Sequence, residues 1–446
     1  MKKLIGALAL AAMVATSAFA EVSFGAWICN LPTLVAYDGE DVKSGGVANP
    51  WGGWRPVRFS TSWTADDGKA GMTMGVSIEN GAIGTFAPNA FWIKPIDQIK
   101  VHVGHFDDSF GLRSDLCFGS WDWLRPNNAV AWGEGITFSA YDFAGFAVQL
   151  FPVEGLNILL GMPMTTSADD AYKAFGQGKV AAAYTIDGIG TIKVGFNGEY
   201  KVNAAKAAVT ANAGVTKDNY YYVAKNGTVT EDANYSTVYS AAMDDQATAT
   251  PTGIEKAAKD LTVADLSVAA ADESKKYGTI EAAFDLTGID KLFVTIGGAF
   301  TIADSDWFKA AGKDGGPQIK FALGASYGIT EAFKLSADFA FAKYHSDVLD
   351  DPVMSFGVGA NYALTEALGI VGDVRMLLPN NNADPTLSFL VGLNGAVGSN
   401  ASLGVGFQGI VGLGDKASTD YGLQVVKPTA ADKFAFAVPV RASFWF

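Results

Sequence analysis

The sequence predicts an all-β fold, a transmembrane antiparallel β-barrel with about eighteen strands and sixteen as the alternative count. Three observations predict it: an alternating strand at the C-terminus, a secretory leader at the N-terminus, and alternation that recurs between them at strand length. Membrane barrels favour even strand numbers, short turns at one end and long outer loops at the other. The short links in this chain alternate with long polar stretches in that way.

The first twenty residues have the pattern of a signal peptide. Lys2 and Lys3 form a positive start, Leu4 to Ala15 an apolar stretch, and Ala18 to Ala20 a small-residue cleavage site. We expect residues 21–446 to form the barrel. No later segment approaches the roughly 20 apolar residues of a membrane-spanning helix.

The amino-acid composition excludes some classes of function. Charged residues make up only 17% of the chain, Gly is abundant at 51 residues, and the net charge is −14. This acidic balance argues against nucleic acid as a partner, because a phosphate backbone attracts basic surfaces. It also raises the local concentration of cations, within the screening length of the solution.

Strands of about 9 to 11 residues are the length that a tilted barrel strand needs. Alternating runs of this length recur along the chain, for example Ile319 to Tyr327 and Phe333 to Phe341. The links Tyr327 to Phe333 and Tyr362 to Leu368 are near copies, which indicates a repeated hairpin. We interpret Gly135 to Phe151 as one long strand, because its apolar residues keep one parity throughout.

The last strand has one apolar and one small or charged face. It runs from Phe434 to Phe446 and places Phe444 and Phe446 on the apolar face. A chain that ends in this way resembles the bacterial outer-membrane β-barrel family, whose C-terminal Phe is recognised by the barrel-assembly machinery. The resemblance implies a place in the bacterial outer membrane, contact with its lipid, and an assembly signal in Phe444, Trp445 and Phe446.

The link after the fifth predicted strand combines charge with large aromatic residues. This loop spans residues 107–133 and contains Asp107, Asp108, Asp115 and Asp122. The layout resembles that of trimeric general porins, in which the third outer loop follows the fifth strand and folds into the barrel. The resemblance implies a constriction loop and a homotrimer. Eighteen strands would depart from the sixteen of general porins.

The alternation of the strands predicts which wall residues face the lumen opposite this loop. If odd positions of the second strand face lipid, then Arg58 faces the lumen, and by the same parity so do Lys100, His102 and Arg441. A basic wall opposite acidic loop residues would orient solutes and set ion selectivity. The prediction is a water-filled porin for small hydrophilic solutes that prefers cations. Alternatively, these charges only pair with one another or with water.

Residues 201–277 break the alternation and are predicted to form a long surface loop. This loop supports a second function, in which the barrel anchors a surface adhesin or antigen and residues 201–277 contact a host ligand. The layout with long loops weakly resembles spirochaete major surface proteins. Single-channel conductance would separate the two functions.

The cysteines and histidines give little information about function. Cys29 and Cys117 either form a disulfide in the oxidising compartment or remain two separate thiols. His102 and His105 fall on opposite faces of one strand, which disfavours a shared metal. The chain contains no phosphate-binding, metalloprotease or nucleophile-elbow motif. We therefore expect no enzyme activity and no cofactor.

Overall fold

The computed structural model describes sixteen stretches of the chain. They are residues 20–30, 32–44, 46–47, 57–79, 82–85, 89–106, 110–115, 137–138, 143–164, 176–203, 220–223, 229–232, 274–379, 383–417, 429–430 and 433–446. The predicted signal peptide lies outside them, apart from Ala20. None of the helices in these stretches is long and apolar enough to span a membrane.

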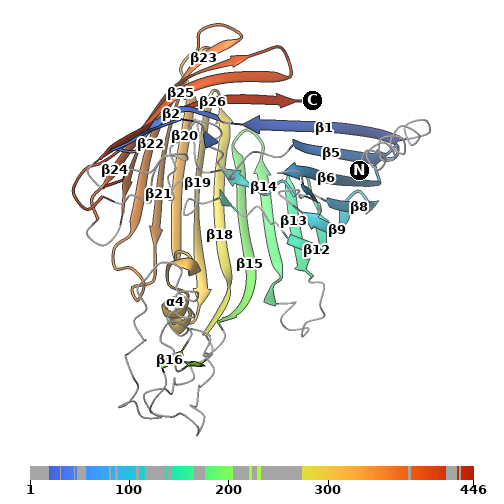
Figure 1. Ribbon diagram of the computed structural model, residues 1–446. Coiled ribbons are helices and arrows are strands. Elements are labelled where there is room, and N and C mark those ends of the chain that lie inside the picture. Colours follow the sequence, from blue (N-terminus) through green and yellow to red (C-terminus); the bar gives the residue numbers. More distant parts are fainter. Residues whose placement is uncertain are drawn as a thin grey trace. The chain divides into compact units, whose positions relative to one another are not determined.

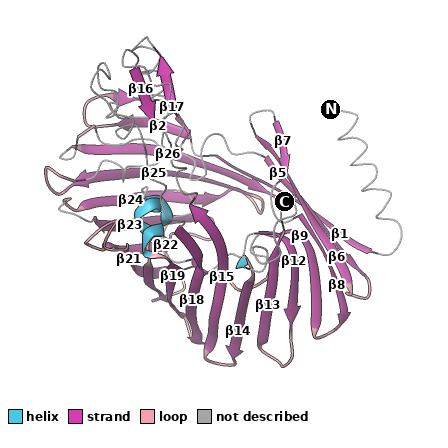
Figure 2. Ribbon diagram, turned by 90° about the horizontal axis from the view of Figure 1, so that it is seen from below, coloured by secondary structure: helices cyan, strands magenta, loops and turns pink. Residues whose placement is uncertain are grey.

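Eighteen antiparallel strands form a closed barrel wall, which confirms the predicted fold class and the larger of the two strand counts. Figure 2 shows the strands following one another around a curve in chain order. The first wall strand consists of two segments, β1 (Ala20–Asn30) and β2 (Pro32–Tyr37), which pair in succession with the last strand. The others are β5 (Val57–Ala65), β6 (Ala70–Glu79), β8 (Asn89–Ile96), β9 (Ile99–Phe106), β12 (Phe143–Leu150), β13 (Leu156–Pro163), β14 (Lys179–Ile186), β15 (Gly190–Asn203), β18 (Ser274–Ile289), β19 (Leu292–Ala303), β20 (Ile319–Gly328), β21 (Phe333–Lys343), β22 (Val353–Ala363), β23 (Leu368–Leu378), β24 (Thr386–Ala396), β25 (Ala401–Gly412) and β26 (Phe434–Trp445).

Short strands add to the edges of this wall. These are β3 (Val42–Lys43), β4 (Gly46–Val47) and β7 (Ala82–Thr85), which pair with β2 or β6. Two further segments, β10 (Ser114–Asp115) and β11 (Thr137–Phe138), pair with each other in a separate sheet.

The barrel closes where the two ends of the chain meet. Trp27 lies opposite Arg58 of β5 on one side and opposite Trp445 of β26 on the other. The backbone N–H of Ala26 donates to the carbonyl of Phe446 at 3.0 Å, and the N–H of Phe446 donates back at 3.1 Å. Closure removes the unpaired strand edge that a sheet in lipid cannot tolerate.

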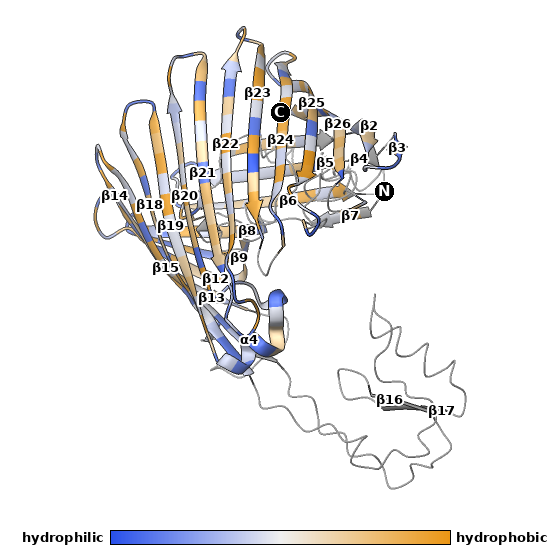
Figure 3. Ribbon diagram, turned by 90° about the vertical axis from the view of Figure 1, so that its left-hand side faces the viewer, coloured by the Kyte–Doolittle hydropathy of each residue, from blue (hydrophilic) through white to orange (hydrophobic). Residues whose placement is uncertain are grey.

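Alternation sorts the wall residues by face. Outward positions are apolar along most strands, and many of them are exposed, such as Phe59, Met74, Phe356 and Val391. Inward positions are mostly small or polar, and many of these are buried, such as Ser355 and Gln408. The apolar colour runs along the wall strands in Figure 3, interrupted by polar positions. This is the division expected of a lipid-facing barrel.

Short and long connections alternate as predicted. Turns at residues 66–69, 97–98, 151–155, 187–189, 290–291, 329–332, 364–367 and 397–400 all lie at the end of the wall that also carries Ala20 and Phe446. We call this the turn end, and the opposite end the loop end.

Asp38 organises the first connection at the loop end. Its carboxylate accepts hydrogen bonds from the backbone N–H groups of Glu40 and Asp41, and it forms an ion pair with Lys43. The Lys43 hydrogen bond is the largest cause, and together these contacts lower the pKa of Asp38 to about 2. Asp38 is therefore ionised throughout the ordinary pH range.

The interpretation of Gly135 to Phe151 as one strand is wrong. The wall strand β12 begins only at Phe143, whereas Thr137 and Phe138 pair with Asp115 and Ser114 in the small sheet. Parity within β12 is nevertheless as predicted, with Phe146, Val148 and Leu150 outward. A shared parity therefore does not by itself distinguish one continuous strand from two separate ones.

The chain forms two compact units, of which the barrel is one. The other comprises Lys201–Lys276 and Ala303–Gly312. It contains the paired strands β16 (Tyr220–Val223) and β17 (Val229–Asp232) and the short helix α4 (Ser305–Ala311). Figure 1 labels β16 and α4, and Figure 2 labels β17. Within this unit the ammonium group of Lys276 lies 5.3 Å from the ring of Trp307. A 3-10 turn (Gly312–Gly315) follows α4.

Deleting Trp445 and Phe446 should prevent stable closure. The deletion leaves the N–H and C=O of Ala26 without backbone partners at a membrane-facing seam, and an unsatisfied buried polar group costs about 1–3 kcal/mol. We expect the deletion variant to lose heat-modifiable migration in gels, both in cells and after refolding in detergent.

Phe446→Ser is the matched control, because it keeps the backbone pair with Ala26 and removes only the terminal ring. If that ring is an assembly signal, this variant should refold in detergent but fail to assemble in cells. Normal heat-modifiable protein from the deletion variant would show that the seam does not depend on the last two residues.

Candidate functional site

The inner face of the barrel carries a segment that folds back onto it. Residues 110–115 follow β9 and lie against inward side chains of neighbouring wall strands. Phe110 and Leu112 are only 3% and 1% exposed, and they belong to one apolar cluster with Phe106, Phe143, Ala147, Leu159, Ala181, Ala183 and Ala283. Strand register places the wall members of this cluster on the inner face. The described part of the predicted constriction loop therefore lies within the barrel.

Aromatic contacts hold the start of this segment. The ring of Phe110 lies 5.1 Å from that of Phe106, 6.1 Å from that of Phe143 and 5.3 Å from that of His102. Gly161 leaves room for this arrangement, because a Cβ there would lie 2.7 Å from the ring of Phe143. A bulky residue at that wall position would displace the cluster.

Hydrogen bonds fix the backbone of the same segment. The carbonyl of Phe110 accepts from the side-chain amides of Gln149 at 3.1 Å and Asn157 at 2.9 Å. Gln149 also donates to Oδ1 of Asn157, so its own Oε1 faces Nε2 of His102 at 2.9 Å. His102 is 3% exposed. It therefore supports the folded segment and does not face open solvent.

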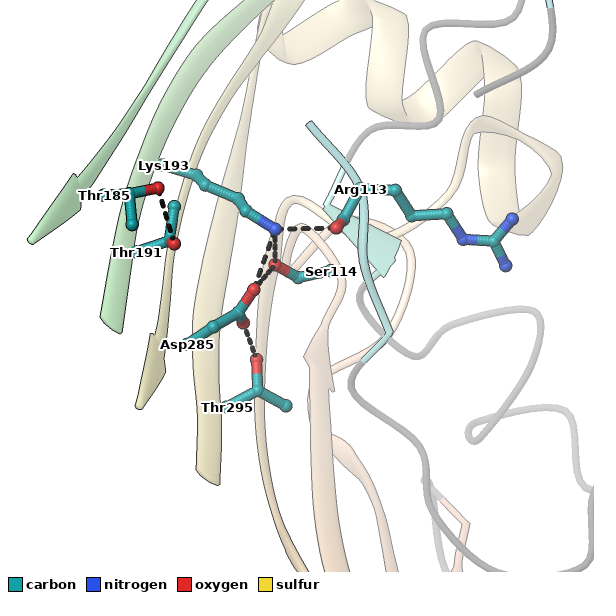
Figure 4. A network of polar contacts seen from close by, with 7 residues as sticks. All are labelled: Arg113, Ser114, Thr185, Thr191, Lys193, Asp285 and Thr295. Atoms are coloured by element: carbon teal, nitrogen blue, oxygen red, sulfur yellow. Dashed lines mark hydrogen bonds and ion pairs between the residues drawn. The ribbon is translucent and has the colours of Figure 1, made fainter. Parts of the chain in front are cut away.

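A buried ion pair anchors the far end of the segment, as Figure 4 shows. Nζ of Lys193 in β15 lies 2.8 Å from Oδ2 of Asp285 in β18, and it donates to the carbonyl of Arg113 at 2.6 Å. The hydroxyl of Ser114 accepts from Lys193 at 2.7 Å and donates to Asp285 at 2.8 Å. Thr295 of β19 donates to the other carboxylate oxygen. Every donor of the ammonium group is thus used, as a buried charge requires.

A second charged cluster lies farther around the inner wall. Nη1 and Nη2 of Arg375 in β23 donate to the two carboxylate oxygens of Asp338 in β21, each at 3.0 Å. Nε of Arg375 lies 2.9 Å from Asp373, an ion-pair contact that does not have hydrogen-bond geometry. Gly357 of β22 lies between these strands, and a Cβ there would approach Arg375 and Asp338 to 2.9 Å. The glycine lets one arginine bridge three strands.

The structure places the predicted wall residues on the inner face. Arg58 lies 6.0 Å from the ring of Trp27, and Lys100 lies 4.2 Å from the ring of Trp92. Nε of Arg441 donates to the hydroxyl of Ser443 at 2.9 Å. His102 faces inward and His105 outward, as their spacing predicted.

The side chains of other predicted residues lie outside the described part of the chain. Asp107, Asp108, Asp122 and Cys117 lie outside the described residues. The backbone of Asp115 pairs with Thr137, and that of Cys29 lies opposite Ser443, but neither side chain is described. The proposed disulfide therefore stays a prediction. Phe444 faces outward and Trp445 inward, 45% and 38% exposed.

Sequence reasoning missed the anchor of the inward segment. Ser114, Gln149, Lys193 and Asp285 were not among the candidate residues, although the last three are charged or polar side chains at inward wall positions. A charged or polar residue at an inward position of a predicted strand is the sequence signal that could have identified these three. The described residues contain no group of three or more His, Cys, Asp or Glu arranged to hold a metal ion.

The described inner wall carries more basic than acidic side chains. On the wall strands outside Lys201–Lys276, Glu21 and Glu79 also occupy inward positions by register, but their side chains lie outside the described residues. Register and contacts give nine basic inward residues and five acidic ones, a difference of four. The basic residues are Arg58, Lys94, Lys100, Lys179, Lys193, Lys320, Lys334, Arg375 and Arg441, and the acidic ones Glu199, Glu281, Asp285, Asp338 and Asp373.

No family model and no curated protein matches this chain. Solved structures that are similar include an anion-selective porin from Comamonas acidovorans, with 12% identity, coverage of 95% of this chain and 100% of that one, and a TM-score of 0.48. A mutant of Rh. blastica porin has 12% identity, the same coverage and a TM-score of 0.44. OmpT of Vibrio cholerae in its trimer form has 10% identity, covers 96% and 100%, and has a TM-score of 0.40.

The closed wall of this chain and its apolar outer face are themselves the architecture of bacterial outer-membrane barrels, as the sequence predicted. The protein belongs in that membrane.

The anchor can be tested by removing its cation. Lys193→Met leaves Asp285 buried without a charged partner, which should destabilise the folded barrel by about 3–5 kcal/mol. Urea unfolding of the barrel in detergent micelles measures this change in free energy.

Lys334→Met is the matched control, since Lys334 is another inward lysine but is not part of the anchor. It should change the unfolding free energy by less than about 0.5 kcal/mol. Adding Asp285→Asn to Lys193→Met should recover part of the loss, because no charge then remains buried alone. Equal effects of the two lysine variants would contradict the anchor.

Proposed function

We propose that this protein is an outer-membrane porin, a water-filled channel through which small hydrophilic solutes and ions diffuse. The observation that carries the proposal is the closed eighteen-strand wall, apolar outside and largely polar inside. A barrel of this strand number is too wide for wall side chains to fill, so an aqueous lumen remains.

The inward segment supports a constriction formed by residues 107–133. Phe110 to Ser114 occupy the inner face beside β9, β12 and β15, where they reduce the free cross-section. Ions and solutes would then pass close to charged wall residues. At such close range a low-dielectric wall strengthens the field on a passing ion.

The cation preference suggested by the sequence rests on four acidic residues of this loop. The side chains of Asp107, Asp108, Asp115 and Asp122 lie outside the described part of the chain. Changing all four to Asn removes that negative charge at similar size, and it should lower the cation-to-anion permeability ratio if they face the lumen.

Assembly into a homotrimer is a further proposal. It rests on the layout of strands and loops in the sequence, which resembles that of trimeric general porins. Lipid and the barrel-assembly machinery are the other proposed partners.

The alternative function is a surface adhesin or antigen that presents residues 201–277 to a host ligand. Most of that loop, and the predicted signal peptide, lie outside the described residues. The resemblance to spirochaete surface proteins likewise stays a prediction, as does the expectation that the protein is not an enzyme.

Planar-bilayer recording tests the proposed channel. Purified, refolded protein should produce stepwise, ohmic conductance increments in potassium chloride, because an open lumen conducts without a gating stimulus. Protein lacking Trp445 and Phe446 serves as the control for insertion artefacts. Heat-modifiable protein that inserts but gives no conductance steps would contradict the proposal.

Deletion of residues 205–273 separates the two functions. The wall strands β15 and β18 remain, and loop-closure entropy changes only slowly with length, so the barrel should still fold and conduct. Any binding to host surface ligands should disappear. Loss of the β-type circular dichroism signal would show that the segment is needed for the wall.

A further inference from the structure

A second connection also packs on the inner wall. Residues 344–352 join β21 to β22 at the loop end, and we call them the wall loop. Tyr344 and Leu349 of this loop are only 5% and 6% exposed. They form one apolar cluster with inward residues of four neighbouring strands, namely Ala322 of β20, Ala340 of β21, Val353 of β22 and Leu377 of β23. The wall loop therefore folds toward the inner face of the barrel.

The burial of small wall residues shows that the inner face is covered there. Ala322 and Ala340 are 0% and 1% exposed. Ser60 of β5 is also a small inward residue, and it is exposed. A small side chain in a wall that borders open water keeps contact with that water, so the two alanines lie beneath other protein atoms. Tyr344 and Leu349 of the wall loop are part of this cover.

Hydrogen bonds give the wall loop a defined shape. The backbone N–H groups of Val348 and Leu349 both donate to the carbonyl of His345, at 2.8 and 3.1 Å. The ammonium group of Lys343 donates to the carbonyl of Asp350, which joins the two ends of the loop. The apolar side chains are thus presented to the wall by an ordered turn.

The wall loop and the segment 110–115 cover adjoining parts of the wall. The segment packs on strands between β9 and β18, and the wall loop packs on β20 to β23. The exposed residues of the wall loop are all polar, namely Ser346, Asp347, Asp350 and Asp351. An apolar side on the wall and a polar side toward water suit an element that narrows an aqueous lumen.

We propose that the wall loop is a second constriction of the pore, which lowers the size limit for neutral hydrophilic solutes such as sugars. This inference rests on the proposed channel function. Strand number fixes the width of the empty barrel, and only elements that fold inward reduce it. Leu349 is the positioning residue, because its buried side chain holds the far part of the loop in the apolar cluster.

Liposome swelling with neutral sugars of increasing size tests the proposal. Leu349→Asn adds no charge, but its amide would be buried in an apolar cluster, so the loop should leave the wall. The swelling rate with the trisaccharide raffinose, relative to that with the monosaccharide arabinose, should rise by about twofold, because a wider lumen hinders the larger sugar less. Leu349→Met keeps the apolar contact and should match wild type.

Leu413→Asn is the matched control. Leu413 also lies at the loop end, directly after β25, but it is 51% exposed, so the same substitution disturbs little packing. Its relative swelling rate should equal that of wild type. Leu349→Ala is a second test variant in case Leu349→Asn does not fold, since it buries no polar group and should act in the same direction by a smaller factor. Circular dichroism and heat-modifiable migration confirm that each variant folds.

The outcomes separate this inference from the channel itself. Folded wild-type protein that admits not even arabinose overturns the proposed channel function. Swelling by wild-type protein, with an unchanged raffinose-to-arabinose ratio in the folded Leu349 variants, overturns the second constriction alone. An equal rise in Leu413→Asn also overturns it, because the effect would then not depend on the packed leucine.

Discussion

Closure of the sheet is the constraint on which the rest of this structure depends. In lipid no water can satisfy a backbone N–H or C=O group, so each must pair within the protein. The seam between β1 and β26 meets that requirement and pairs Ala26 of the first wall strand with Phe446 at the end of the chain. Once eighteen strands close, the width of the lumen is fixed, and side chains can only narrow it.

Side chains on the inner face narrow a lumen of that width. In this chain they do so through apolar clusters packed on the wall and through an arginine that links two strands across a third. The segment from Phe110 to Ser114 packs on the wall near β9 to β18, and a second apolar cluster joins Tyr344 and Leu349 of the β21–β22 connection to Leu377. Arg375 reaches across Gly357 to Asp338. Small residues on one strand thus give space to large or charged ones on the next, as close packing requires.

The sequence sufficed for the wall because a period of two is a local property. Parity alone placed Arg58, Lys100, His102 and Arg441 on the inner face. It failed for residues 135–151, where one parity spans two separate strands, and it could not show that Lys193 meets both Ser114 and Asp285. Those contacts join residues 79 and 92 positions apart. Such pairs follow from the folded register of the barrel and from no short-range pattern.

For the ion selectivity of a channel, the location of charged side chains matters more than the net charge of the protein. The whole chain carries a net charge of −14, which by itself would favour cations. Charges in exposed connections act through water and are screened within about 8 Å at physiological salt. Arg58 and Lys100 instead lie on the inner face beside Trp27 and Trp92, where the low-dielectric wall lets each charge act at closer to full strength. An acidic protein can therefore form a pore whose described lining is basic.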